Sequence, residues 1–324
     1  MRPLTALPRV LLALSLLLAA CGGGDGEGEG ASSETTTTTP AISAIVASYD
    51  LAVGPPARFT VGVVNTEEGP VGYGTVQLRF FYLGTGDADT EAKPGPSATG
   101  HYLPLPESPP APAGADKPVY LKETERGVYA ADVAFDQPGF WGVAVTADLD
   151  KTETATATFK VAPTHSVPAP GDPALPSENL TVDTPGAPPG AIDSRAGGGD
   201  PVPDPDLHRT TVKQALDAGR PVVLVISTPT FCVSVFCGPV TDMVGELAAT
   251  YADRASFVHI EVWKDYEGKA LNDAAKDWIA RGADINEPWV FLIGADGKIS
   301  ARWDNVVTRG EVEALLQKLP VIAG

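Results

Sequence analysis

The alternation of apolar and polar residues predicts β-strands in the first half of the chain. Short segments rich in Val, Thr, Phe and Tyr recur there, several with a period of two residues, as in TATATFKV at 154–161. This period is typical of strands with one buried face. Pro and Gly crowd residues 84–118, which predicts a long loop. We expect strands at residues 42–48, 58–64, 71–83, 128–135, 140–147 and 154–161.

Strands at this density over residues 41–162, with turn residues between them, are typical of an immunoglobulin-like sandwich. We therefore expect an all-β domain over that range. Nothing in its composition indicates a catalytic site, so we expect it to be a spacer or a partner-binding domain.

The pattern changes after residue 205 and predicts an α/β layer fold with a mixed sheet over residues 206–324. The run PVVLVI at 221–226 has the length of a buried strand. Val240, Met243, Val244 and Leu247 then fall on one face of an amphipathic helix. We also expect helices at 210–218, 269–281 and 309–319 and strands at 256–262, 289–293 and 298–303.

Residues 163–205 join the two predicted domains and contain 11 Pro and 6 Gly in 43 residues. Such a composition buries too little apolar surface to offset the entropy of ordering. We predict a semi-extended linker, in which a short element could dock near residues 191–194. The chain as a whole is thus expected to be multidomain.

The N-terminus predicts export. Arg2 and Arg9 form a basic leader before an apolar run at 10–20, which is shorter than the ~20 residues of a membrane-spanning helix and fits a secretory signal. The run ends in Leu18-Ala19-Ala20-Cys21, which resembles the lipobox of bacterial lipoproteins. The resemblance implies a signal peptide at 1–20, diacylation of Cys21 and a flexible tether at 21–40. Two acyl chains give stable anchoring, so we expect an extracytoplasmic protein anchored to the lipid of the cell membrane. The alternative is an ordinary signal with a coincidental Cys.

Charge and composition exclude other classes. With 41 acidic and 23 basic residues the net charge is −18, so we expect no nucleic-acid partner, because such binding needs Lys and Arg to neutralise phosphates. Four His and two Met are too few ligands for a His-rich metal-storage protein. We predict no cofactor.

Cys232 and Cys237 are the candidate reactive residues. If Cys21 carries lipid, they have only each other as partners, and an extracytoplasmic pair can persist as a disulfide. They lie between a predicted strand and a predicted helix, where the helix N-terminus stabilises a thiolate. A second thiol nearby can resolve a mixed disulfide.

The order of elements, the Cys pair after the first strand and Pro288 before a later strand resemble the thioredoxin fold family. The stretches TPTFC, CGP and EPWVF also resemble those of actinobacterial-type lipoproteins with thioredoxin-like domains. The resemblance implies that Cys232, Cys237 and a cis-Pro288 form the catalytic site. This chain departs from the family in its Cys-x-x-x-x-Cys spacing and in having Ile226 at the position of a buried carboxylate. Glu287 should bring a carboxylate near the thiols instead.

Two functions follow from this pattern. One is a membrane-anchored thiol–disulfide oxidoreductase acting on the thiols or disulfides of exported proteins. The other is a non-enzymatic binding lipoprotein whose disulfide is structural. A smaller alternative is copper bound by the two thiolates and a His, for which His259 is a candidate, although a packed His is expected in that strand. One alignment register makes Cys232 the exposed, attacking thiol, and another begins the motif at Cys237; we favour Cys232.

Overall fold

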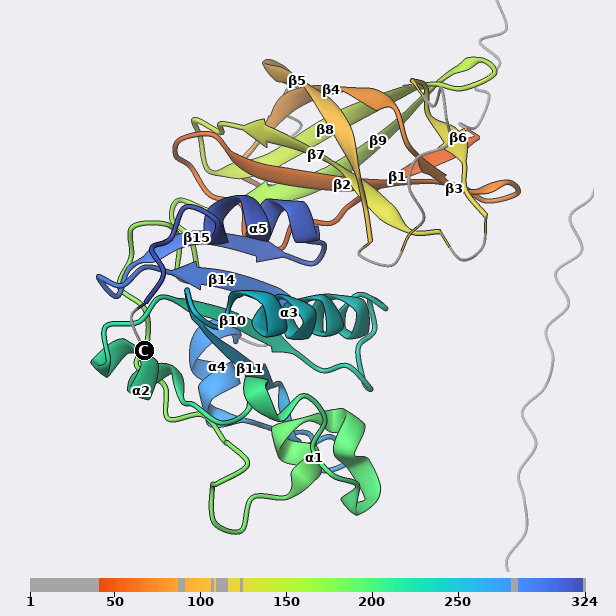
Figure 1. Cartoon of the computed structure of the whole chain (residues 1–324). Coiled ribbons are helices and arrows are strands. Elements are labelled where there is room, and N and C mark those ends of the chain that lie inside the picture. Colours follow the sequence, from red (N-terminus) through yellow and green to blue (C-terminus); the bar gives the residue numbers. More distant parts are fainter. Residues whose placement is uncertain are drawn as a thin grey trace, which may run out of the picture. The chain divides into compact units, whose positions relative to one another are not determined.

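The computed structural model describes residues 41–86, 91–105, 108, 116–122, 125–280 and 285–322 (Figure 1). The predicted signal peptide, Cys21 and the tether lie outside these residues. Within the described residues, no helix is both long and apolar enough to cross a membrane.

Residues 41–162, called here the N-terminal region, are rich in β-structure. Their hydrogen-bonded path runs β6-β3-β2-β7-β5-β4-β8-β9, with β1 paired to β2. All described strands of the region thus belong to one sheet, whereas an immunoglobulin-like sandwich would have two separately bonded sheets. The strands are β1 (Ile42–Val46), β2 (Ala57–Asn65), β3 (Gly69–Gly72), β4 (Thr75–Gly84), β5 (Lys93–Pro104), β6 (Val119–Tyr120), β7 (Gly127–Val133), β8 (Gly139–Asp148) and β9 (Thr152–Val161).

An aromatic core holds this sheet together. Alternate residues of β8, among them Trp141 and Val143, are buried, as the period-two pattern predicts. Phe59 and Phe80 meet edge to face with ring centroids 5.0 Å apart, and Phe135 packs edge to face against Phe80 at 5.5 Å. Such pairs add to the stabilisation that burial alone provides.

Two predictions for the N-terminal region are wrong in detail. The strand predicted at 71–83 is divided into β3 and β4, because Tyr73 and Gly74 both have positive φ. The long loop predicted at 84–118 contains β5. Its prolines are tolerated because they lie where β5 has a paired strand on one side alone: Pro94 pairs with β4 and Pro104 with β7.

Residues 206–322, called here the C-terminal region, contain a mixed sheet, as predicted. Its order is β11-β10-β14-β15, with β10 parallel to β11 and antiparallel to β14. The strands are β10 (Val222–Ser227), β11 (Ser256–Glu261), β14 (Trp289–Ile293) and β15 (Ile299–Asp304); a small hairpin has β12 (Trp263–Asp265) and β13 (Ala270–Leu271). The helices are α2 (Val212–Asp217), α3 (Cys237–Tyr251), α4 (Asp273–Ile279) and α5 (Arg309–Leu316). The helix predicted at 269–281 is shorter, because its first residues belong to β13.

Side chains cover both faces of this sheet. On one face Leu224 and Ile226 of β10 pack in a cluster with Trp278 of α4. On the other face Val223 and Val225 pack with residues of α3 and α5. Burial on both faces explains why β10 is a continuous apolar run.

The prediction that residues 163–205 have no core is wrong. Val167 and Ala174 belong to the core cluster of the C-terminal region, and the segment pairs with the start of β15 through Ala174 N–H donating to Gly297 O at 2.8 Å and Ile299 N–H donating to Asp172 O at 2.9 Å. It also forms the helical turns α1 (Pro189–Ile192), η1 (Ser194–Gly199) and η2 (Pro205–Leu207). The element expected near 191–194 is therefore present, and Pro and Gly shape a fixed path instead of a free linker.

The turn that divides β3 from β4 gives a first prediction. Gly74 has φ +52°, and a Cβ there would overlap the backbone of Lys117. Gly74→Ala should lower the free energy of unfolding by about 2 kcal/mol, because both the left-handed backbone and the overlap oppose a side chain. Urea denaturation measures the change. Gly54→Ala is the control, since nothing lies within 4 Å of its added Cβ; equal stability of the two variants would contradict this account of the turn.

Candidate functional site

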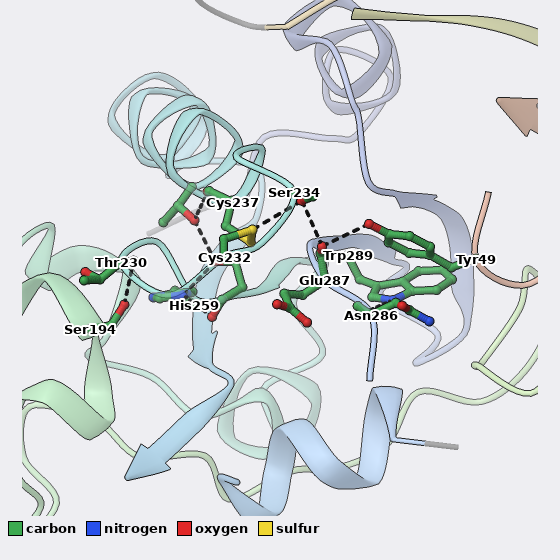
Figure 2. Close-up of a disulfide and its surroundings, with 12 residues drawn as sticks. Tyr49, Ser194, Thr230, Cys232, Ser234, Cys237, His259, Asn286, Glu287 and Trp289 are labelled. Atoms are coloured by element: carbon green, nitrogen blue, oxygen red, sulfur yellow. Dashed lines mark hydrogen bonds between the residues drawn. A yellow bond between two sulfur atoms is a disulfide. The ribbon is translucent and has the colours of Figure 1, made fainter. Parts of the chain in front are cut away.

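A disulfide joins Cys232 and Cys237 across the loop between β10 and α3 (Figure 2). We call residues 228–236 the disulfide loop. Cys237 is the first residue of α3 and is fully buried, whereas Cys232 is half-buried. This asymmetry agrees with the alignment register that we favour, in which Cys232 is the more exposed of the two.

The disulfide loop presents apolar side chains to solvent. Val233 is 94% exposed and Val235 is 62% exposed. Val235 also has φ +59°, a conformation that β-branched residues rarely adopt. On the other side of Cys232, Phe231 stacks on Tyr266 with ring centroids 4.0 Å apart. The surface around Cys232 is therefore apolar and partly aromatic.

Glu287 and Pro288 lie beside the disulfide. The Glu287–Pro288 peptide bond is cis, as the resemblance leads us to expect, and Pro288 immediately precedes β14. A carboxylate oxygen of Glu287 lies within 4.8 Å of both cysteine sulfurs. Burial, followed by the nearby charge of Glu261, raises the pKa of Glu287 to about 7. The structure thus brings the predicted site residues Cys232, Cys237 and Pro288 together with an acid that is half-ionised near neutral pH.

A second acid, Glu261, was not predicted from the sequence. Ile226, at the position where the resemblance would place a buried carboxylate, is fully buried and apolar. On the neighbouring strand, Glu261 pairs in register with Ser227 and is 1% exposed. It accepts hydrogen bonds from Ser194 N–H at 2.8 Å and Trp263 N–H at 3.1 Å, and burial raises its pKa. The signal for it was the alternation of His and Glu with apolar residues in FVHIEV, residues 257–262.

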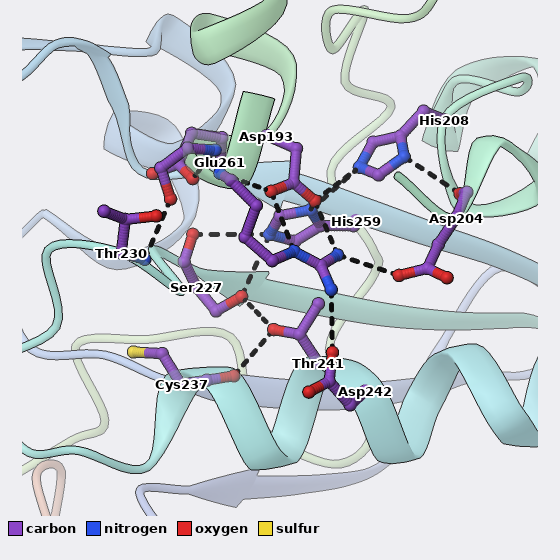
Figure 3. Close-up of polar contacts among 12 residues, drawn as sticks. Asp193, Asp204, His208, Ser227, Thr230, Cys237, Thr241, Asp242, His259 and Glu261 are labelled. Atoms are coloured by element: carbon purple, nitrogen blue, oxygen red, sulfur yellow. Dashed lines mark hydrogen bonds and ion pairs between the residues drawn. The ribbon is translucent and has the colours of Figure 1, made fainter. Parts of the chain in front are cut away.

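A chain of buried polar side chains runs from the start of α3 into β11 (Figure 3). Thr241 donates to the carbonyl oxygen of Cys237 at 2.7 Å, and its oxygen lies 2.6 Å from Ser227 Oγ. Ser227 Oγ is 2.9 Å from His259 Nε2, and His259 Nδ1 is 2.9 Å from His208 Nε2. His259 is thus a packed, hydrogen-bonded residue, as expected for this strand.

The geometry does not support the copper alternative. Among the described residues, the group of potential ligand atoms around the two sulfurs contains Glu287 and not His259. His259 groups instead with Asp193 and His208. In the disulfide each sulfur is bonded to the other, so the pair offers no thiolate to an ion.

Asp193 anchors the polar chain from the segment 163–205. It is fully buried and binds Arg195, with Nη2 2.7 Å from Oδ2 and Nε 3.0 Å from Oδ1. Burial raises the pKa of Asp193, but hydrogen bonds from His259 and Arg195 outweigh it and hold the pKa below its usual value. Burial lowers the pKa of His208 to about 3, so His208 is neutral at pH 7. Arg195 is therefore the cationic partner of the Asp193 carboxylate. Arg195 Nη1 also binds Oδ1 of Asp242 on α3 at 2.7 Å.

This ion pair gives a second prediction. Arg195→Met should lower the free energy of unfolding at pH 7 by about 3 kcal/mol, because it leaves a buried carboxylate without its cation. Since the pKa of Asp193 is lowered, the stabilisation is complete above about pH 4 and declines as the pH falls further. Urea denaturation at pH 7 and pH 3 should therefore show a smaller difference between variant and wild type at the lower pH.

Arg209→Met is the matched control, because Arg209 pairs with Asp206 at the surface, where such a pair contributes less than about 1 kcal/mol. A loss for Arg195→Met no greater than that of Arg209→Met would show that Asp193 does not need this cation.

Comparisons of the chain with models of protein families, with curated proteins and with solved structures found no match in any of the three. The function proposed for this site therefore depends on its own residues and geometry.

Proposed function

We propose that this chain is a thiol–disulfide oxidoreductase that acts on exported proteins while anchored to the cell membrane through acylated Cys21. The observation that carries the proposal is the unequal burial of the disulfide: Cys232 is half-buried in a loop and Cys237 is fully buried at the first residue of α3. One sulfur is thus open to a substrate and the other is placed to resolve the bond that forms.

The exchange proceeds by two substitutions at sulfur. A substrate thiolate attacks Cys232 Sγ; a substrate–Cys232 disulfide forms, the Cys232–Cys237 bond breaks, and its electron pair leaves on Cys237 Sγ, which takes up a proton. A second substrate thiolate then attacks the substrate sulfur of the mixed disulfide and releases Cys232 as a thiolate. Two electrons pass from the substrate dithiol to the protein, and the reverse sequence reduces a substrate disulfide.

The position of the pair favours this chemistry. The unpaired N–H groups and positive dipole end of α3 stabilise negative charge on a sulfur at its N-terminus. The thioredoxin-like assignment of residues 206–324 belongs to the same proposal. Its support is the order β10, disulfide, α3, with Pro288 before β14 and the hairpin of β14 and β15 followed by α5.

A second candidate is a non-enzymatic binding lipoprotein with a structural disulfide. The exposure of Val233 and Val235 favours it, because apolar side chains held out by a cross-linked loop can bury against a partner. The reduction potential separates the two: a value below about −300 mV marks a structural bond, and one between about −270 and −120 mV marks a catalyst.

The third prediction tests the oxidoreductase. After reduction, Cys232 should react with iodoacetamide at pH 6 clearly faster than a thiol of pKa about 8.5, and Cys237 should react slowly because it is buried. Cys237→Ser should accumulate mixed disulfides with exported proteins, since no thiol remains to resolve them. Cys232→Ser is the control and should trap none. Equal, slow alkylation of both thiols with no trapped adducts would leave the binding lipoprotein as the better account.

The fourth prediction tests the anchor. Cys21→Ser removes the sulfur that would be diacylated, so the variant should leave the membrane fraction or stay unprocessed. Fractionation followed by mass spectrometry of the N-terminus measures both. A variant that is processed and still sediments with the membrane would contradict the lipoprotein assignment.

A further inference from the structure

Tyr49, which follows β1 in the N-terminal region, reaches the disulfide loop of the C-terminal region (Figure 2). Its hydroxyl donates to the carbonyl oxygen of Glu287 at 3.2 Å, and its ring lies against Trp289 with centroids 6.1 Å apart. Burial raises the pKa of Tyr49, so the phenol stays protonated and able to donate.

Buried contacts fix the backbone that carries Tyr49. The Tyr49 N–H donates to Asp304 Oδ2 at 2.5 Å. The side chain of the next residue, Asp50, is almost fully buried and accepts hydrogen bonds from Arg302 Nη1 at 2.8 Å and from Ser166 N–H at 2.9 Å. Burial raises the pKa of Asp50, but His165, Ser166 and Arg302 together lower it below its usual value. A buried ion pair of this kind holds its partners in place, so the position of the hydroxyl is determined by the fold.

Ser234 has two acceptors for one proton. Its Oγ lies 3.3 Å from Cys232 Sγ and 3.4 Å from the carbonyl oxygen of Glu287. A hydroxyl donates one hydrogen bond at a time. When Cys232 is a thiolate, it is the stronger acceptor, because hydrogen bonds to a charged group are roughly twice as strong as neutral ones. Turning the proton to sulfur removes it from the partly buried Glu287 carbonyl, which then loses a stabilising hydrogen bond unless another donor remains.

We propose that Tyr49 is a positioning residue of the redox site: it keeps the Glu287 carbonyl hydrogen-bonded, so that Ser234 is free to donate its proton to the Cys232 thiolate. The inference rests on the proposed oxidoreductase function. It makes the N-terminal region a working part of the site, because the hydroxyl that supports the thiolate comes from that region.

The charges around Cys232 make this hydrogen bond important. The carboxylate of Glu287 faces the sulfurs, Glu261 on β11 lies behind it, and Asp304 on β15 lies beside Tyr49. Negative charges oppose a thiolate, whereas the N-terminus of α3 favours it. The cation of Arg302 is 5.4 Å from the ring centroid of Trp289 and is engaged by Asp50. Ser234 is thus a neutral donor that acts directly on the sulfur.

The fifth prediction compares Tyr49→Phe, Ser234→Ala and the double variant in the full chain. Tyr49→Phe keeps the ring against Trp289 and removes only the hydroxyl. After reduction, iodoacetamide labelling of Cys232 is followed from pH 5 to pH 9 by peptide mass spectrometry, which separates it from Cys237 and Cys21. Each single variant should shift the midpoint of Cys232 upward by about one pH unit, a tenfold slower reaction at pH 6, and the double variant should shift it no further.

Tyr129→Phe is the matched control, because the Tyr129 hydroxyl donates to Tyr73 O at 2.9 Å inside the N-terminal region and not to a residue of the disulfide loop. It should leave the profile of Cys232 unchanged. If wild-type Cys232 is reactive and traps substrates but Tyr49→Phe has the wild-type profile, the inference is wrong and the oxidoreductase stands. Additive shifts in the double variant would also overturn it, since the two hydroxyls would then act independently. An unreactive wild-type Cys232 would overturn both proposals.

Discussion

The buried carboxylate of Asp193 is the constraint on which the surroundings of the disulfide depend. An ionised group without solvent must be paired and hydrogen-bonded, and Arg195 and His259 do this from two sides. Arg195 is two residues away, but His259 belongs to β11, so the pairing fixes a Pro- and Gly-rich segment against the sheet. Ser194 lies between Asp193 and Arg195 in the sequence. Its N–H donates to Glu261, and its Oγ accepts from Thr230 N–H in the disulfide loop at 3.1 Å. The path of the disulfide loop is therefore tied to the pairing of this one carboxylate.

The same constraint explains why the polar chain under α3 is tolerated. Ser227 ends an apolar strand and is fully buried, where an unpaired hydroxyl would be costly. Its oxygen has Thr241 on one side and His259 on the other. The series of hydrogen bonds therefore runs from His259 on β11 to the carbonyl of Cys237. A fully satisfied network of this kind is rigid, and it holds the first turn of α3, where the shielded sulfur lies.

Much of the fold and part of the site could be predicted because their signals are local. The apolar run of β10, the period of α3 and the place of the cysteine pair all follow from neighbouring residues. Three features could not be predicted in this way. β5 can lie in a Pro-rich stretch because its prolines have a paired strand on one side only. Asp193 can be buried because the cation of Arg195 and the imidazole of His259 bind its carboxylate. Tyr49 reaches the disulfide loop because Asp304 and its neighbours on β15 hold the Tyr49 backbone. Each depends on a partner distant in sequence, so no periodicity reports it.

In the proposed oxidoreductase, the balance of charges at the disulfide sets the direction of its chemistry. A protein that stabilises its thiolate oxidises others, because stabilising the reduced form makes the disulfide a stronger oxidant. Here the N-terminus of α3 and, in our proposal, the Ser234 hydroxyl favour the thiolate, while Glu287, with its pKa raised to about 7, opposes it only when ionised. As the pH falls through 7, Glu287 takes up a proton and this opposition is removed, so the disulfide becomes easier to reduce relative to a couple without such an acid. The hydroxyl contribution has no such dependence on pH, because Ser234 stays neutral. The two influences on Cys232 are thus separable by pH.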